Sequence, residues 1–157
     1  MHEIVIIEDM RSESDLLQIL LGGKAIFGQH IQCHPFTTIE QALQWIKAHP
    51  TAIVAVIIDR TLGDDNGLRI IPNLKHPTAP WGNLVIIVWS QHDDNHMIGE
   101  ARQIGADAFV SKQYVTPRLG DEMIHIVETM LTHDRQEQNR PWICISRGGY
   151  ASSSSSP

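Results

Sequence analysis

The chain has 157 residues, 42% of them apolar, which is enough for one domain with a buried core. Its 12 basic and 18 acidic side chains give a formal net charge of −6, which argues against direct binding of nucleic acid or anionic lipid. The two cysteines, Cys33 and Cys144, have neither disulfide nor zinc-site spacing, so we interpret them as packing residues in a reducing cytoplasm.

The sequence predicts neither secretion nor membrane insertion. Its N-terminal segment lacks a basic region followed by an apolar run and a cleavage site. No apolar stretch approaches the roughly 18 residues that are needed to span a bilayer.

The first predicted elements are a strand and a helix. Residues 4–7 form a continuous apolar run closed by Glu8 and Asp9, which is typical of a strand buried on both faces. Ser12 and Asp15 resemble a capping box, and apolar residues then recur at helical spacing until two glycines end the run.

A second strand and helix are predicted next. Residues 30–36 indicate a strand weakly, and Thr37 with Glu40 predicts the cap of a helix that ends at Pro50. The chain therefore begins with alternating strands and helices.

The third and fourth strands carry stronger signals. Residues 52–58 are the longest β-branched run and end at Asp59, and a helix is predicted over 68–75. Residues 84–89 repeat the strand pattern and end at Ser90.

The last elements of the periodic region follow the same alternation. A helix is predicted over 97–104, a short strand over 108–110 before Lys112, and an amphipathic helix over 116–131.

This alternation predicts an α/β domain over residues 1–133. We expect a five-stranded, doubly wound parallel sheet of the flavodoxin-like strand order 2-1-3-4-5, covered by five helices. Ligands bind such sheets at the carboxyl ends of the strands. Five polar residues are expected to converge at that edge: Glu8, Asp9, Asp59, Ser90 and Lys112.

Residues 134–157 are expected to form a C-terminal extension that is largely disordered or in part a cloning remnant. A polar run leads there to a short apolar piece over 142–145 and a tail that contains five consecutive serines.

The residues at the sheet edge suit phosphoryl chemistry. Crowded carboxylates repel one another unless a hard divalent cation lies among them, and oxygen-only ligands favour Mg²⁺. Asp59 is then the natural nucleophile and would form an acyl phosphate. Lys112 could bind the phosphoryl oxygens as a point charge, and the Ser90 hydroxyl could donate a hydrogen bond to them.

Over residues 3–131 the arrangement resembles the receiver domains of two-component response regulators. The resemblance depends on Glu8 and Asp9 after the first strand, Asp59 after the third with Gly67 beyond it, Ser90 after the fourth and Lys112 after the fifth.

The resemblance implies the roles of the metal ligands. Asp9 and Asp59 would bind Mg²⁺ directly, the backbone carbonyl of Thr61 would complete the protein ligands, and Glu8 would act through water. Beyond magnesium-dependent self-phosphorylation and autodephosphorylation, no separate enzymatic activity is expected.

The resemblance also implies a switch and its partners. Ser90 would move toward the phosphoryl group and Phe109 would turn inward, which alters a surface made by the fourth helix, fifth strand and fifth helix. The donor would be a sensor histidine kinase or phosphotransfer protein, and the output an effector protein or a homodimer.

Several residues depart from the family pattern. Gly63 and Gln113 stand where the family usually has proline, and Phe109 lacks the usual tyrosine hydroxyl. Arg60 replaces an apolar residue, and either solvent or an acid such as Asp64 could be its partner.

Two other functions stay open, the first because of these departures and the second because metabolic phosphatases also form acyl phosphates. One is a receiver-like binding module that works without phosphorylation. The other is a magnesium-dependent phosphohydrolase, although Thr61 stands where such enzymes have a second aspartate. His92 and His96 have the spacing of a metal pair on a helix, but we interpret them as part of an exposed loop.

Overall fold

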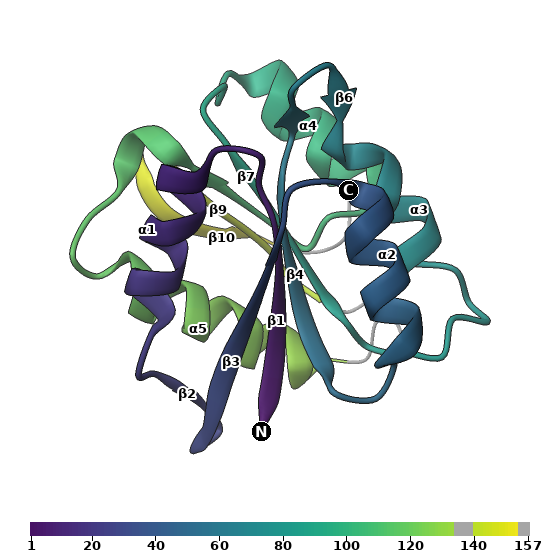
Figure 1. Cartoon of the computed structure of the whole chain (residues 1–157). Coiled ribbons are helices and arrows are strands. Elements are labelled where there is room, and N and C mark those ends of the chain that lie inside the picture. The colour runs from purple at the N-terminus through teal and green to yellow at the C-terminus, as the bar shows by residue number, and fades with distance from the viewer. Residues whose placement is uncertain (134–139, 154–157) are drawn as a thin grey trace.

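An eight-stranded sheet lies at the centre of the computed structural model, which describes residues 1–133 and 140–153 (Figure 1). The strands of this sheet lie in the order β10-β9-β8-β7-β4-β1-β3-β2. Their bounds are β1 His2–Ile7, β2 Ala25–Ile26, β3 Gln29–Phe36, β4 Ile53–Asp59, β7 Val85–Ser90, β8 Ala108–Ser111, β9 Trp142–Ser146 and β10 Gly149–Ser153.

The five predicted strands form the parallel core of this sheet. In chain order they are β1, β3, β4, β7 and β8, and β1 pairs in parallel with β3 and β4, β4 with β7, and β7 with β8. The predicted order 2-1-3-4-5 is therefore confirmed. The structure adds β2, β9 and β10 at the two edges of the sheet.

Five helices cover the two faces of the sheet. They are α1 Arg11–Leu21, α2 Ile39–Ala48, α3 Ile71–Leu74, α4 Asn95–Ile104 and α5 Leu119–Leu131. Figure 1 shows α1 and α5 on one side of the sheet and α2 and α3 on the other. Among the described residues, no helix is long and apolar enough to cross a membrane.

The continuous apolar strands supply both halves of the core. In β1, Ile4 and Ile6 pack with α1 and α5, whereas Val5 and Ile7 pack on the opposite side with α2 and α3. Successive side chains of a strand point to opposite faces, so a strand that is covered on both faces must be apolar throughout. This requirement explains why these strands lack the alternation of a half-exposed sheet.

The helix starts differ from the predicted caps. Helix α1 follows Met10 and has no side-chain cap; instead the Met10 amide donates to Glu8 Oε1 at 3.0 Å. Helix α2 is capped by Thr38, whose hydroxyl accepts from the Gln41 amide at 3.3 Å. The capping boxes predicted at Ser12 and Thr37 were wrong, because Met10 and Thr38 have the extended backbone geometry of the N-cap position.

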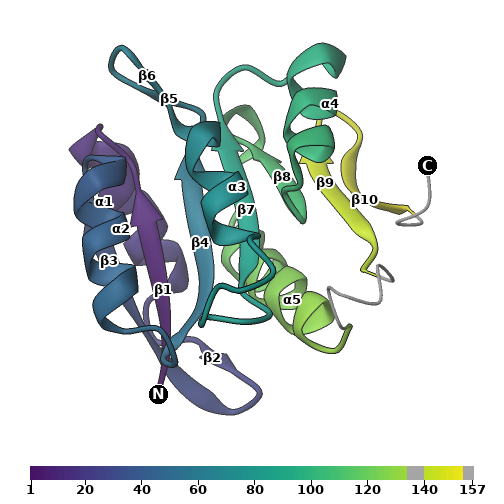
Figure 2. The ribbon, with the colours of Figure 1, turned by 90° about the vertical axis from the view of Figure 1, so that its right-hand side faces the viewer.

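The C-terminal segment differs from the expected unstructured tail over the part that the structure describes. Strand β9 pairs in parallel with β8, and β10 pairs with β9 in the antiparallel sense. Figure 2 shows β9 and β10 beyond β8, at the edge of the sheet that lies near α4 and α5. Ile143 and Ile145 are buried in the core. Residues 134–139 and 154–157 of the predicted extension lie outside the described residues.

A buried ion pair fixes this segment to the domain. Arg140 is 6% exposed, and its Nη1 lies 3.2 Å from Oδ2 of Asp107. The same guanidinium donates to the backbone carbonyls of Asn83 and Leu84 at 2.5 and 3.3 Å. Asp107 Oδ2 also accepts from the Ile86 amide at 2.8 Å, so the pair joins the new strand to β7 and to the start of β8.

We expect Arg140→Ala to lower the free energy of unfolding by about 3–5 kcal/mol, because it leaves the Asp107 carboxylate buried without this charge partner. Urea unfolding measures the loss. Arg147→Ala is the control, since Arg147 is exposed in the β9–β10 turn and should change stability by less than about 0.5 kcal/mol. Equal stability of the two variants would contradict the anchoring role of Arg140.

Candidate functional site

The carboxyl ends of three parallel strands bring the strongest sequence candidates together. Glu8 follows β1, Asp59 ends β4 and Lys112 follows β8. Strands β1 and β4 are neighbours, whereas β7 lies between β4 and β8. The Lys112 side chain therefore reaches across the end of β7, and its Nζ lies 5.7 Å from the ring centroid of Trp89.

Lys112 is bound by three carboxylates. Its Nζ lies 2.9 Å from Glu8 Oε2 and 3.1 Å from Asp59 Oδ2, and it also contacts Glu13 Oε2. The side chain of Lys112 is 7% exposed, that of Glu8 is fully buried, and that of Asp59 is 6% exposed. These four residues, which we call the Lys112 cluster, form a charged group at the carboxyl edge of the sheet.

Glu13 is a member of the cluster that the sequence analysis missed. It lies in the first turn of α1, where an acidic residue is ordinarily explained by the helix dipole. The first turn of α1 begins at the sheet edge where β1 ends. The position of Glu13 shortly after the acidic pair could therefore have identified it as a residue of this edge.

Burial and mutual repulsion shape the ionisation of the cluster. The pKa of Glu8 is raised to about 8, mainly by burial and also by the charge of Asp59, although the hydrogen bond from Lys112 opposes both effects. Burial alone would lower the pKa of Lys112, but the hydrogen bonds to Glu13 and Glu8 and the charge of Asp59 together raise it. The lysine therefore stays cationic.

Asp59 is held in place by the backbone that follows it. Its Oδ1 accepts from the Thr61 amide at 3.0 Å, while Oδ2 faces Lys112. Gly67 passes so close that a Cβ at this position would lie 1.9 Å from the Asp59 carbonyl oxygen. Only glycine fits there, which gives a physical reason for the Gly67 signal in the sequence.

The strands β5 (Thr61–Leu62) and β6 (Asp65–Asn66) form a small hairpin beside the site. Gly63 begins its two-residue turn with φ +61°, a conformation that proline cannot adopt. The departure at Gly63 is thus a consequence of this hairpin. Of the two alternatives for Arg60, the structure shows pairing with an acid, but the partner is Glu100 of α4 and not Asp64: Arg60 Nη2 lies 3.2 Å from Glu100 Oε2.

Asp9 lies apart from the Lys112 cluster. Its residue is exposed, and its Oδ2 lies near the turn of the small hairpin, 3.9 Å from where a Cβ on Gly63 would stand. The two acids differ in burial: Glu8, directly after β1, is buried like the last residues of that strand, whereas Asp9, one residue later, is exposed.

Ser90 and Phe109 are both buried, Ser90 at 1% and Phe109 at 0% exposure. The Ser90 hydroxyl donates to the His92 carbonyl at 3.1 Å and accepts from the His92 amide at 3.2 Å. Phe109 packs in the half of the core that lies against α2, α3 and α4. Ser90 therefore stabilises the start of the loop from β7 to α4.

The three carboxylates of the cluster are of the kind that could hold a hard cation, but in this structure the Lys112 ammonium contacts all of them. Carboxylate oxygens of Glu8, Glu13 and Asp59 lie within 4.8 Å of one another, and oxygen ligands suit Mg²⁺. Among the described residues this is the one such group of three acidic, histidine or cysteine ligands. His92 lies in the exposed loop before α4 and His96 lies in the first turn of that helix, so the two do not share a helical face.

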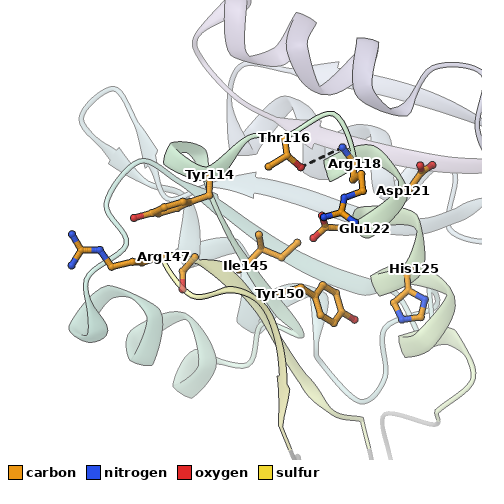
Figure 3. A pocket seen from close by; sticks show the side chains of 11 residues that line it. Tyr114, Thr116, Arg118, Asp121, Glu122, His125, Ile145, Arg147 and Tyr150 are labelled. Carbon is orange, nitrogen blue, oxygen red and sulfur yellow. Dashed lines mark hydrogen bonds between the residues drawn. The ribbon is translucent and has the colours of Figure 1, made fainter.

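A separate cavity of about 560 Å³ lies between the N-terminal part of α5 and the β9–β10 hairpin (Figure 3). Figure 3 shows Ile145 between Tyr114 and Tyr150, with charged side chains of α5 beside them. This cavity contains none of the four residues of the Lys112 cluster.

Comparison with known proteins identifies relatives of this arrangement. Residues 4–124 match the response regulator receiver domain. The chain is similar to the two-component response regulator PprB of Pseudomonas aeruginosa, with 29% identity over 127 residues, or 81% of this chain. The chain spans 42% of the length of that relative.

Solved structures share the fold. The signal receiver domain of a DNA-binding response regulator from Colwellia psychrerythraea aligns with a TM-score of 0.68 and 18% identity, covering 82% of this chain and 99% of that one. A response regulator receiver protein from Burkholderia phymatum aligns with a TM-score of 0.64 and 22% identity, covering 81% and 95%.

We expect Gly67→Ala to lower the free energy of unfolding by about 2–3 kcal/mol, because the new methyl group displaces the backbone of Asp59. Gly99→Ala is the control. Gly99 lies in α4 with no atom near its Cβ position, so this substitution should stabilise the protein by about 0.8–1 kcal/mol. Chemical unfolding measures both effects, and an unchanged Gly67→Ala variant would contradict the close approach.

Proposed function

Because this chain belongs to the response regulator receiver domain family, we propose that it is a phosphoacceptor switch in which Asp59 receives a phosphoryl group. The observation that carries the proposal is the approach of Lys112 Nζ to within 3.1 Å of Asp59 Oδ2 at the carboxyl edge of the sheet. A buried ammonium beside a carboxylate can bind the phosphoryl oxygens as charge moves onto them.

The proposed transfer is a substitution at phosphorus. An oxygen of the Asp59 carboxylate attacks the phosphorus atom, the new O–P bond forms, and the bond between phosphorus and the donor breaks. With a phosphohistidine donor the broken bond is P–N, and the imidazole leaves with the electron pair. The expected donor is therefore a sensor histidine kinase or a phosphotransfer protein in the cytoplasm.

The cofactor that we propose is Mg²⁺. Bound at this edge, it would neutralise charge on the transferring phosphoryl group. Asp9, Asp59 and the Thr61 carbonyl would hold it directly, and Glu8 would act through water, as the family resemblance implies. The exposed Asp9 carboxylate is free of the cluster and can turn toward such an ion without breaking a contact with Lys112.

The proposed switch begins at Ser90. To donate to a phosphoryl oxygen, its hydroxyl must give up the hydrogen bond to the His92 carbonyl, which changes the loop that leads into α4. Phe109 is already fully buried, so in this chain we expect the change to pass through the loop and α4 more than through inward rotation of the ring.

The output surface that we propose includes the C-terminal hairpin. In the family resemblance this surface consists of the fourth helix, fifth strand and fifth helix. Here β8 is the fifth strand of that core, and β9 pairs with its outer edge. An effector protein or a second copy would therefore meet α4, α5 and the β9–β10 hairpin instead of an open edge of β8.

Intact-mass analysis after incubation with acetyl phosphate and Mg²⁺ tests this function. We expect one added phosphoryl group, lost in Asp59→Asn and after chelation of Mg²⁺. Asp64→Asn is a matched control, because Asp64 is an exposed acid in the adjacent hairpin turn and should leave labelling intact. An unlabelled wild-type chain would instead favour a binding module that works without phosphorylation.

A further inference from the structure

All the hydrogen-bonding capacity of the Lys112 ammonium is used in this structure. An ammonium has three donors, and three different carboxylates, those of Glu8, Glu13 and Asp59, lie against it. Before the O–P bond to Asp59 forms, an incoming phosphoryl group can bind Lys112 only if one of these contacts is given up.

Glu13 is the contact that can be given up most easily. Its side chain is 30% exposed, whereas that of Glu8 is fully buried and that of Asp59 is 6% exposed. Moving Glu8 away would leave a buried carboxylate without its cation, which is costly. Glu13 can instead turn to water from the first turn of α1.

The charge of Glu13 also indicates that its contact with Lys112 must be given up. The Glu13 carboxylate lies against the Lys112 ammonium, so an incoming phosphoryl dianion is repelled by Glu13 and loses part of the attraction of Lys112. Glu13 thus opposes phosphoryl binding both through its own charge and through its contact with the lysine.

We propose that Glu13 is a positioning residue that holds Lys112 in the unphosphorylated chain and must release it before Asp59 can be phosphorylated. This inference rests on the proposed phosphoacceptor function and adds a constraint specific to this chain. Glu13 then acts as an internal competitor of the phosphoryl group, and its contact with Lys112 slows self-phosphorylation.

The rate of labelling by acetyl phosphate at saturating Mg²⁺ tests this role. We expect Glu13→Gln to be labelled about fivefold to tenfold faster than wild type, because a neutral amide binds the ammonium more weakly. Glu13→Ala, which removes the contact completely, should be at least as fast. Asp15→Asn is the matched control, since it removes one charge from the same helix at an exposed site away from Lys112.

A second measurement uses the metal-free protein and does not depend on phosphorylation. Hydrogen exchange of the Lys112 ammonium can be followed by ¹H–¹⁵N NMR, with its signal assigned by its loss in Lys112→Arg. We expect faster exchange in Glu13→Gln than in wild type or Asp15→Asn, because the ammonium has lost one of its acceptors.

The outcomes separate the two proposals. If wild type is not labelled, the proposed phosphoacceptor function is wrong, and so is the role of Glu13 that rests on it. If wild type is labelled but Glu13→Gln is no faster, only the role of Glu13 is overturned. The role of Glu13 is also overturned if Asp15→Asn is labelled as fast as Glu13→Gln, or if Glu13→Gln is labelled faster while its Lys112 ammonium exchanges at the wild-type rate. In either case Glu13 would act through general charge and not through the lysine.

Discussion

The buried ammonium of Lys112 is the interaction on which the site depends. It lies among three carboxylates at the end of a sheet whose interior is apolar, so each charge there is tolerated only because the others are present. The parallel strands bring these groups together from residues about a hundred positions apart. Since Lys112 must cross the end of β7 to reach Asp59, the order and register of β4, β7 and β8 determine the geometry of the cluster.

Much of this arrangement could be predicted, because continuous β-branched runs are typical of strands that are buried on both faces. The acids and the lysine that terminate those runs were therefore assigned to one edge, and the structure brings Glu8, Asp59 and Lys112 together there. Glu13 could not be assigned in the same way. The periodicity of a helix predicts which of its residues face the core. It does not predict which long side chain contacts a lysine that follows a distant strand.

The C-terminal strands show a different limit of sequence patterns. The apolar piece Trp142–Ile145 is short, and its length alone cannot distinguish a strand from an isolated hydrophobic cluster. Its assignment depends on tertiary contacts, namely pairing with β8 and the buried pair of Arg140 with Asp107. With β9 on that edge, β8 is paired on both sides, and the surface next to α4 and α5 includes the β9–β10 hairpin.

The most direct test of the central claim is ¹⁹F NMR of the chain with Mg²⁺ and beryllofluoride, which mimics a phosphoryl group bound to a carboxylate. If Lys112 and Asp59 form a phosphoacceptor site, bound-fluoride signals should appear in the wild type, disappear in Asp59→Asn, and be weakened in Lys112→Met. Absence of bound signals in the wild type, or their survival in Asp59→Asn, would contradict the assignment of the Lys112 cluster as the phosphoryl site.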